Sequence, residues 1–469
     1  MFQLINSILL EFMKNFKRVK TWQWFVVLMM GFMLRGNRRG VTSIVSSLRL
    51  RPGLYHTMLH FFRSTGYTVG DLYNKWIKIV IRRGTLWQVA GYIVLLGDHI
   101  KISKEGRRMP DIQTMHQESQ NSGKAEYIEG HTYGHVSAVI TNGKSSRSIP
   151  LITELQKSPP RKEGTKKPDG DTLVVQMVNL VYEAAKSIGK PVIAALDAYF
   201  SSRFAWATAD KAISETGERL VEIVTRAQTN TVAYTVPGPQ NRKRRGAPRK
   251  YGDKIVLYKL FNDMSRFKET TMGIYGKQSK VRYLCLDLIW KPVKKLVRFV
   301  AVEVDGDTIV LMSTSLALDP RDIITIYVLR FKIETSFGEQ KNEMGCFGYH
   351  FWTTALPKRK KWKKFDEPQE EKLQKRINEA RRAAASFVCL STIATGILTI
   401  IAFSHSGDIW KRYPGWIRTL RSTIPSIAII RETIAQDFHA YLQLHPHVPI
   451  CSIIKSKLRK VDFLYDDVA

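Results

Sequence analysis

The segment ITIYVLRFKIETSFGEQKNEMG, residues 324–345, combines an apolar helical pattern with one aromatic and three charged side chains. At about 100° per residue, Tyr327, Arg330, Glu334 and Lys341 fall on one stripe roughly 60° wide. The apolar side chains occupy another part of the same helical wheel, namely Ile326, Leu329, Ile333, Phe337 and Met344. An ordinary amphipathic helix with a solvated edge explains this pattern. A carboxylate held beside two cations and a phenol, facing an anion, explains it equally well.

The overall charge favours an anionic partner. The 469 residues include 73 Lys and Arg against 41 Asp and Glu, a formal net charge of +32. Such a balance is typical of proteins that bind nucleic acid, although a merely basic surface would give the same number. The hydrophobic content of 44% indicates a folded chain, long enough for roughly two to four domains.

Cysteine usage and the apolar runs indicate a soluble protein of a reducing compartment. The four cysteines form no CxxC pair, which gives no zinc signature. The apolar run 24–33 is too short to span a bilayer, and LRGNRRG after it contains no small-residue cleavage site. The run 383–403 is long enough to span, but Ser, Thr and Gly interrupt it. A buried helix is therefore favoured over a membrane span.

The first 85 residues are predicted to be helical and basic. Residues 40–50 and 54–64 form two short helical patterns separated by the turn sequence Arg-Pro-Gly. A DNA-binding helix-turn-helix would have this pattern, and so would the corner of any small helical bundle.

A layered α/β core is predicted after residue 86. The run GYIVLLGD ends in Asp98 and the run PVIAALD ends in Asp197, as expected for buried strands that deliver a carboxylate at their ends. Further strands are predicted at 134–143 and 219–227, and a helix at 172–190.

A basic, glycine- and proline-rich loop at 235–254 interrupts this core. It is predicted to contact phosphates rather than to be merely solvated, because cations are many and acids few. Short β-like runs follow up to residue 315, which indicates a β-rich insertion before the segment 324–345. A second basic run, 358–365, is either a contact to the nucleic acid backbone or a linker.

Three carboxylates, Asp98, Asp197 and Glu334, are candidates for metal ligands. Carboxylates that converge in a basic cleft are costly unless they bind a cation, and two Mg²⁺ ions on such a trio suit phosphodiester chemistry. The alternative is that a strand-end aspartate only caps a turn or helix. Two pairs of aspartates in Gly-containing contexts are expected simply to make turns, namely Asp169 and Asp171, and Asp305 and Asp307.

The spacing Tyr327, Arg330, Glu334, Lys341 matches the pattern Y-(2)-R-(3)-E-(6)-K. With the runs ending in Asp98 and Asp197 before it, the chain resembles a group of bacterial insertion-sequence DDE transposases from about residue 40 to about residue 356. In place of the second acid or Thr that follows the first aspartate in some relatives, this chain has His99.

The resemblance implies a ribonuclease H-like catalytic core, interrupted by a β-rich insertion and flanked by a helical N-terminal domain and a helical C-terminal region. Asp98, Asp197 and Glu334 would be the catalytic, metal-binding triad, with two Mg²⁺ ions that Mn²⁺ can replace. Tyr327, Arg330 and Lys341 would bind DNA phosphates. In relatives, a Trp of the insertion stacks on a flipped base, for which Trp290 is the candidate here.

We therefore divide the chain by its expected roles: 1–85 helical and DNA-end-binding, 86–230 first part of the core, 231–320 basic loop and β-rich insertion, 321–405 remainder of the core, and 406–469 of unknown role. The expected function is cleavage of inverted-repeat ends and their joining to target DNA. The expected partner is double-stranded DNA, in a dimeric complex of a cytoplasmic, nucleoid-associated protein without a membrane. The alternative is a non-catalytic, domesticated or inhibitory derivative that only binds DNA.

Overall fold

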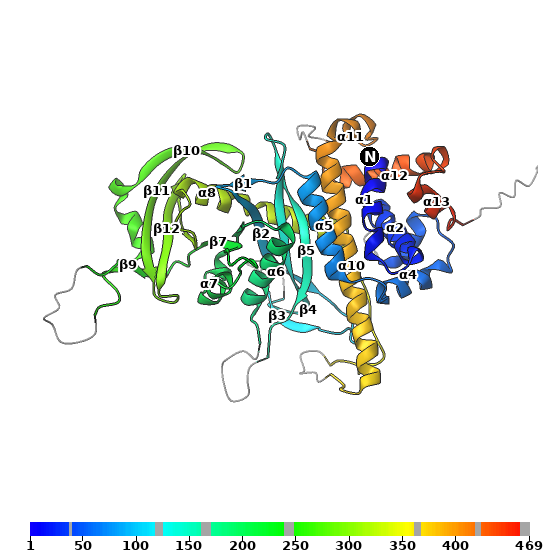
Figure 1. Ribbon diagram of the computed structural model, residues 1–469, viewed down its shortest axis with the longest axis horizontal. Helices are drawn as coiled ribbons and strands as arrows, with labels where there is room; N and C mark the ends of the chain where they lie inside the picture. The colour runs from blue at the N-terminus through cyan, green and yellow to red at the C-terminus, as the bar shows by residue number, and fades with distance from the viewer. Residues whose placement is uncertain are drawn as a thin grey trace, which may run out of the picture.

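The computed structural model describes residues 1–36, 40–117, 125–160, 170–238, 248–360, 367–417 and 424–459. In this part of the chain, thirteen strands form one mixed sheet, and helices cover both faces and one end of it (Figure 1). The α/β class expected from the sequence is therefore confirmed. The strands are β1 (Gln88–Val89), β2 (Tyr92–Ser103), β3 (Gln113–His116), β4 (Tyr127–Thr141), β5 (Ser146–Gln156), β6 (Val192–Ala195), β7 (Val221–Arg226), β8 (Val232–Tyr234), β9 (Lys254–Val256), β10 (Lys268–Ile274), β11 (Lys277–Trp290), β12 (Lys295–Val304) and β13 (Asp307–Ser313).

Helices dominate the two ends of the chain. The α-helices are α1 (Phe2–Glu11), α2 (Val19–Leu34), α3 (Val41–Ser47), α4 (Leu54–Arg63), α5 (Val69–Arg83), α6 (Leu173–Ile188), α7 (Arg203–Ala209), α8 (Pro320–Leu329), α9 (Lys332–Gly338), α10 (Glu371–Ser404), α11 (Ser406–Arg412), α12 (Ile427–Leu444) and α13 (Pro449–Lys455). The two short helical patterns predicted at 40–50 and 54–64 correspond to α3 and α4.

The centre of the sheet has the strand order β5-β4-β2-β6-β7. β2, β4 and β5 pair antiparallel, whereas β6 runs parallel to β2 and β7 runs parallel to β6. The crossover from β5 to β6 contains α6, which packs against β2, β4 and β5. Since Leu96 pairs with Ala195 in the parallel register, Asp98 and Asp197 lie side by side. Asp197 follows the end of β6 as predicted, but the predicted strand end at Asp98 is wrong, because β2 continues to Ser103.

The predicted β-rich insertion extends this same sheet. β13 pairs antiparallel with β7, and β12, β11, β8 and β9 follow outward in that order. One prediction in this region is wrong: of the β-like run 255–261, only the start belongs to a strand, and Leu257–Asn262 forms a 3-10 helix.

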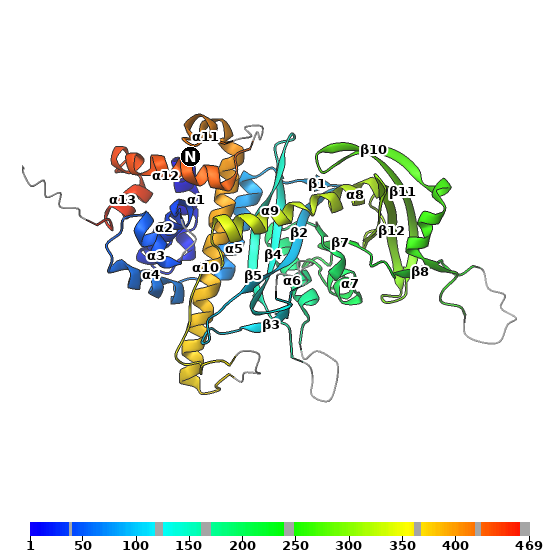
Figure 2. The ribbon, with the colours of Figure 1, turned by 180° about the vertical axis from the view of Figure 1, so that it is seen from behind.

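Alternation along the central strands separates two cores. Val94 and Leu96 of β2 pack with Ile326 and other apolar side chains of α8, whereas Leu95 faces the cluster that contains α6. Figures 1 and 2 show α6 on one face of the sheet and α8 and α9 on the other. Side chains on the same face of β2 as Leu96 therefore point toward the segment 324–345, which we call the signature segment.

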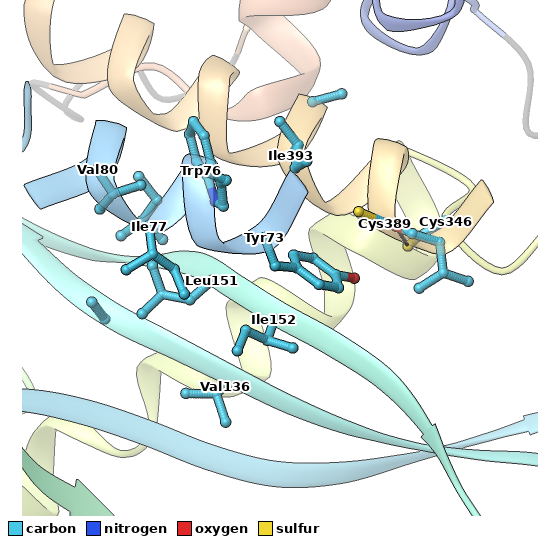
Figure 3. Packing of buried hydrophobic residues seen from close by; sticks show 14 of the residues in the cluster. Tyr73, Trp76, Ile77, Val80, Val136, Leu151, Ile152, Cys346, Cys389 and Ile393 are labelled. Atoms are coloured by element: carbon cyan, nitrogen blue, oxygen red, sulfur yellow. Dashed lines mark hydrogen bonds between the residues drawn. The ribbon is translucent and has the colours of Figure 1, made fainter. Parts of the chain in front are cut away.

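The long helix α10 lies inside the fold. It packs against β5 and against α2, α4, α5 and α12. Tyr73 and Trp76 of α5 fill the space between β5 and α10 (Figure 3), and a Cβ at Gly396 would lie 2.1 Å from the Trp76 ring. Among the described residues α10 is the one helix long and apolar enough to cross a membrane, but 94% of its apolar window is buried in the fold.

Candidate active site

Asp98 lies near the middle of β2, just beyond the strand's fully buried apolar part. Asp98 is an even number of residues from Val94 and Leu96, so its side chain lies on the same face of the sheet as theirs. The carboxylate therefore points toward α8 and α9. Burial, followed by the negative charge of Asp197, raises the pKa of Asp98 to about 7; the charge of Glu334 acts in the same direction. Asp98 thus lies close enough to both other predicted carboxylates for their charges to raise its pKa.

Asp197 follows β6 at the C-terminal edge of the parallel strands. Its carboxylate accepts a hydrogen bond of 2.9 Å from the backbone N–H of Tyr199, and its carbonyl accepts one from the hydroxyl of Thr225 on β7. The cap predicted as the alternative role is therefore present. It does not exclude a second role, because a carboxylate oxygen has lone pairs for more than one partner.

Glu334 lies on α9 and is exposed, but the signature segment is not one continuous helix as predicted. α8 ends at Leu329, α9 begins at Lys332, and a π-helix follows over Glu339–Glu343. The backbone N–H groups of Arg330 and Ile333 donate to carbonyls three residues earlier, which tightens the turn between α8 and α9. A wheel drawn for one regular helix therefore misplaces residues beyond Arg330.

Arg330 occupies this break and lies between two of the carboxylates. Its Nη1 is 3.7 Å from a carboxylate oxygen of Asp98 and 4.0 Å from one of Glu334. Both distances exceed hydrogen-bond length, so the guanidinium provides electrostatic compensation without a fixed bidentate pair.

Tyr327 lies one turn before Arg330, with the guanidinium carbon 5.7 Å from the centre of its ring. Burial raises the pKa of the Tyr327 phenol, and the charges of Arg330 and Arg226 oppose that rise. Arg226 is the last residue of β7. Its side chain lies on the same face of the sheet as Val224, which is the face that α8 covers. The sequence interpretation missed Arg226, although its place at the end of a parallel strand beside Asp197 was a usable signal.

Lys341 lies apart from the other signature residues, exposed on the π-helix. The structure therefore brings Tyr327, Arg330, Glu334, Asp98 and Asp197 into one neighbourhood. Lys341 lies further along the signature segment, in the part that contacts α10 and α12.

Hydrogen bonds attach α9 to the sheet behind the carboxylates. The buried His135 of β4, which pairs with Asp98 in register, bonds through its two ring nitrogens to Thr153 (2.8 Å) and Ser336 (3.1 Å). Ser148 of β5 donates to the carbonyl of Lys332 at 2.8 Å. These bonds fix the backbone that carries Glu334 relative to the strand that carries Asp98.

Two buried arginines bind the far end of the signature segment, and we call them the arginine clamp. Arg35, which follows α2, donates to the carbonyls of Met344 and Gly345, and Arg431 of α12 donates to the carbonyl of Glu343. Burial and the neighbouring Arg431 lower the pKa of Arg35 to about 9. Region 406–469, for which the sequence showed no role, thus supplies one of the two contacts.

The donor set suits a hard divalent cation, because carboxylates supply oxygen ligands. Burial first, and then the charges of Asp197 and Glu334, raise the pKa of Asp98. Within the described ranges, however, no three His, Cys, Asp or Glu side chains form a ready metal-binding group. The guanidinium of Arg330 provides the positive charge beside the carboxylates of Asp98 and Glu334.

Other predicted features are placed as follows. Asp305 makes the tight turn between β12 and β13 with φ of 52°, as expected, whereas Asp307, also expected in the turn, is the first residue of β13. Asp169 lies outside the described residues, as do 239–247 of the basic loop and 361–365 of the second basic run. Trp290 is 6% exposed and packs against Trp206, with ring centres 5.2 Å apart. Its ring is therefore already covered by the protein.

Comparison with known proteins adds little. No family model matches the chain, and no curated protein matches it. Among solved structures, the chain is similar to the crystal structure of the NurA nuclease from Sulfolobus solfataricus, with a TM-score of 0.23 and 9% identity over 60% of this chain and 86% of that one. A similarity of this size carries no argument, so the function rests on the site itself.

Proposed function

We propose that the protein is a DNA transposase that cleaves the ends of its insertion sequence and joins them to target DNA. The observation that carries this proposal is that Asp197 and Glu334, from two other parts of the chain, lie near Asp98, with Arg330 beside Asp98 and Glu334. The central strands and the crossover helix α6 support a ribonuclease H-like core as the scaffold.

The chain's own residues suit phosphodiester chemistry. Asp98, Asp197 and Glu334 would hold Mg²⁺, with Mn²⁺ as a substitute. Bound divalent ions would activate the attacking water or 3′-hydroxyl and stabilise the leaving oxygen. Arg330 and Tyr327 lie beside the carboxylates and would hold the scissile phosphate, while Lys341 and Arg226 would add charge along the DNA backbone.

Further parts of the proposal rest on the same chemistry. Double-stranded DNA is the partner that a net charge of +32 favours. Bringing two transposon ends together would require a dimer in the DNA complex, and the N-terminal helices would bind the ends. Such a protein would act in the cytoplasm at the nucleoid.

The test is a nicking assay on DNA that carries the element's inverted repeats. We expect wild-type protein to cleave only with Mg²⁺ or Mn²⁺, and Asp98→Asn to cleave at least about 10³-fold more slowly. Asp305→Asn, at the β12–β13 turn, is the matched control and should cleave normally. Metal-independent cleavage, or full activity of Asp98→Asn, would contradict the proposal.

The second candidate is a DNA-binding derivative without catalytic activity. The observation in its favour is that no ready metal-binding group exists among the described residues. End binding by wild-type protein, with no cleavage at any Mg²⁺ or Mn²⁺ concentration, would select this candidate.

A further inference from the structure

We propose that His99 is a positioning residue, which holds the loop that carries Asp197 against β2 so that Asp98 and Asp197 keep the spacing that a shared cation requires. The proposal rests on the proposed function, because it takes these two aspartates as ligands of one cation. His99 follows Asp98 directly on β2, so its side chain lies on the opposite face of the sheet, which α6 covers. It would therefore act from behind the site.

The backbone of the sheet leaves the spacing of the two aspartates open. The parallel pairing of β2 with β6 ends at Leu96 and Ala195, two residues before each aspartate. After this point the carbonyl of Asp197 accepts a hydrogen bond from the hydroxyl of Thr225, which belongs to β7 and not to β2. Side chains therefore have to fix the distance between Asp197 and β2.

The imidazole ring of His99 contacts the loop that follows Asp197. It stacks on the ring of Phe200, with ring centres 5.3 Å apart and an interplanar angle of 28°, and it meets the ring of Tyr199 edge-on at 6.1 Å. Both aromatic residues belong to the 3-10 helix Ala198–Phe200, which Asp197 caps by accepting the backbone N–H of Tyr199. A displacement of this short helix would therefore move the carboxylate of Asp197 as well.

The ring of His99 is itself held in place from β5. Its Nε2 lies 2.6 Å from Oε1 of Gln156, the last residue of β5, which is 5% exposed. The amide of Gln156 passes over Gly134, the residue of β4 that pairs with His99. A Cβ at Gly134 would lie 2.2 Å from Nε2 of Gln156. The glycine thus leaves room for the amide that orients the imidazole.

His99 also contacts the other aspartate. Its backbone N–H donates to Oδ1 of Asp98 at 2.7 Å. One residue thus touches the carboxylate on β2 with its backbone and the loop of Asp197 with its ring. Ligands of a metal site have to be held within roughly 0.5 Å of their productive geometry. A loop that moves relative to β2 would therefore weaken a cation site built on both aspartates.

Hydrogen exchange without metal, measured by mass spectrometry on peptides that span residues 197–203, tests the contact directly. His99→Ala removes the ring contacts, and we expect exchange in these peptides to become about tenfold faster. His99→Phe keeps an aromatic ring against Phe200 and should stay within about threefold of wild type. Lys101→Met, two residues further on the same face of β2, is the matched control and should exchange like wild type.

Gly134→Ala tests the support of the ring while both stacked rings stay in place. The added methyl group would displace the amide of Gln156 from His99. We expect exchange in the same peptides to become about threefold faster, and Gln156→Ala should give the same result. These two variants keep the proposal testable if His99→Ala does not fold.

Mn²⁺ affinity, measured by electron paramagnetic resonance, separates positioning from folding. His99→Ala should bind Mn²⁺ about tenfold more weakly than wild type, whereas His99→Phe should bind it nearly as well. The DNA cleavage that His99→Ala loses should return at higher Mg²⁺ concentration, because both aspartates are still present. The urea midpoint of each variant is measured in parallel, and a loss of stability alone would not respond to Mg²⁺ in this way.

Three results would overturn the role of His99: exchange of 197–203 in His99→Ala within about twofold of wild type, faster exchange throughout the protein with an equally lowered urea midpoint, or faster local exchange with unchanged Mn²⁺ affinity. Normal metal-dependent cleavage together with any of these refutes the positioning role alone. A wild-type protein that neither binds Mn²⁺ nor cleaves DNA refutes the transposase, and local exchange in the variants then decides by itself whether His99 holds the loop of Asp197.

Discussion

The two ends of the signature segment are stabilised in opposite ways. Near its start, three carboxylates lie close together, and the single guanidinium of Arg330 stays 3.7 to 4.0 Å from two of them. At its far end, the arginine clamp of Arg35 and Arg431 donates directly to backbone carbonyls. Like charges lie close together at one end, whereas at the other end arginine side chains donate hydrogen bonds to backbone carbonyls.

This difference separates function from stability. A cluster of like charges costs folding free energy, and such a cost is retained where a cation or substrate relieves it. Hydrogen bonds to buried carbonyls do the reverse, since an unsatisfied carbonyl is costly. Substitutions at the carboxylates should therefore abolish chemistry with little loss of stability, whereas substitutions in the clamp should destabilise the fold.

The largest effect is expected from Asp197→Asn and Glu334→Gln. Each should lower the rate of DNA cleavage at least about 10³-fold, because each removes a charged ligand from the reacting centre. Binding of end DNA, measured by gel shift, should change less than about twofold. Thr335→Ala, next to Glu334 on the exposed side of α9, is the control. Cleavage at the wild-type rate by either carboxylate variant would remove that residue from the site.

The clamp should reveal the opposite behaviour. Arg35→Met leaves the carbonyls of Met344 and Gly345 without their donor and should reduce the free energy of unfolding by about 2 kcal/mol. Urea unfolding measures this loss, and Arg18→Met, at the exposed start of the same helical region, should be neutral. Cleavage per folded molecule should fall less than tenfold. Unchanged stability would show that the clamp contributes nothing to the fold.

The raised pKa of Asp98, caused first by burial and then by the charge of Asp197, should appear as a pH dependence of stability. Its pKa is about 7 in the folded protein, against an ordinary value of 3.8. Between these values the folded state holds more protons than the unfolded state, so stability falls as the pH rises from about 4 to about 7. Asp98→Asn removes this loss and should gain on the order of 1–3 kcal/mol over wild type at pH 8 relative to pH 5. Parallel stability–pH curves for the two proteins would contradict a raised pKa of Asp98 in the folded protein.

The smallest effect concerns Arg330. Arg330→Ala should weaken DNA binding about tenfold and lower the slope of log affinity against log salt by about 1. Arg321→Ala is the control, because Arg321, at the start of α8, is already paired with Asp319 at 3.0 Å. An unchanged slope for Arg330→Ala would mean that this guanidinium serves only the carboxylates.

Much of the central architecture could be predicted from local patterns. The apolar runs that end near Asp98 and Asp197 become β2 and the parallel strand β6, because continuous apolar runs favour strands covered on both faces. The periodicity of 172–190 likewise gives α6. Register could not be predicted, although the pairing of Leu96 with Ala195 is what brings the two aspartates together.

Other features had no local signal. The break at Arg330 is invisible to a helical wheel, which assumes one regular period. The contacts of Arg35 and Arg431 are to backbone carbonyls, and these leave no mark in the partner's sequence. The joining of β13 to β7 depends on pairing between distant strands, so the insertion could not be assigned to the core sheet beforehand.

The central claim is that Asp98, Asp197 and Glu334 form one cation site, and Mn²⁺ binding tests it most directly. Electron paramagnetic resonance measures free Mn²⁺ without requiring DNA or activity. Wild-type protein and the turn variant Asp305→Asn should bind Mn²⁺ with equal affinity, and the double variant Asp98→Asn, Asp197→Asn should lose that binding. Equal Mn²⁺ binding by all three proteins would contradict the claim.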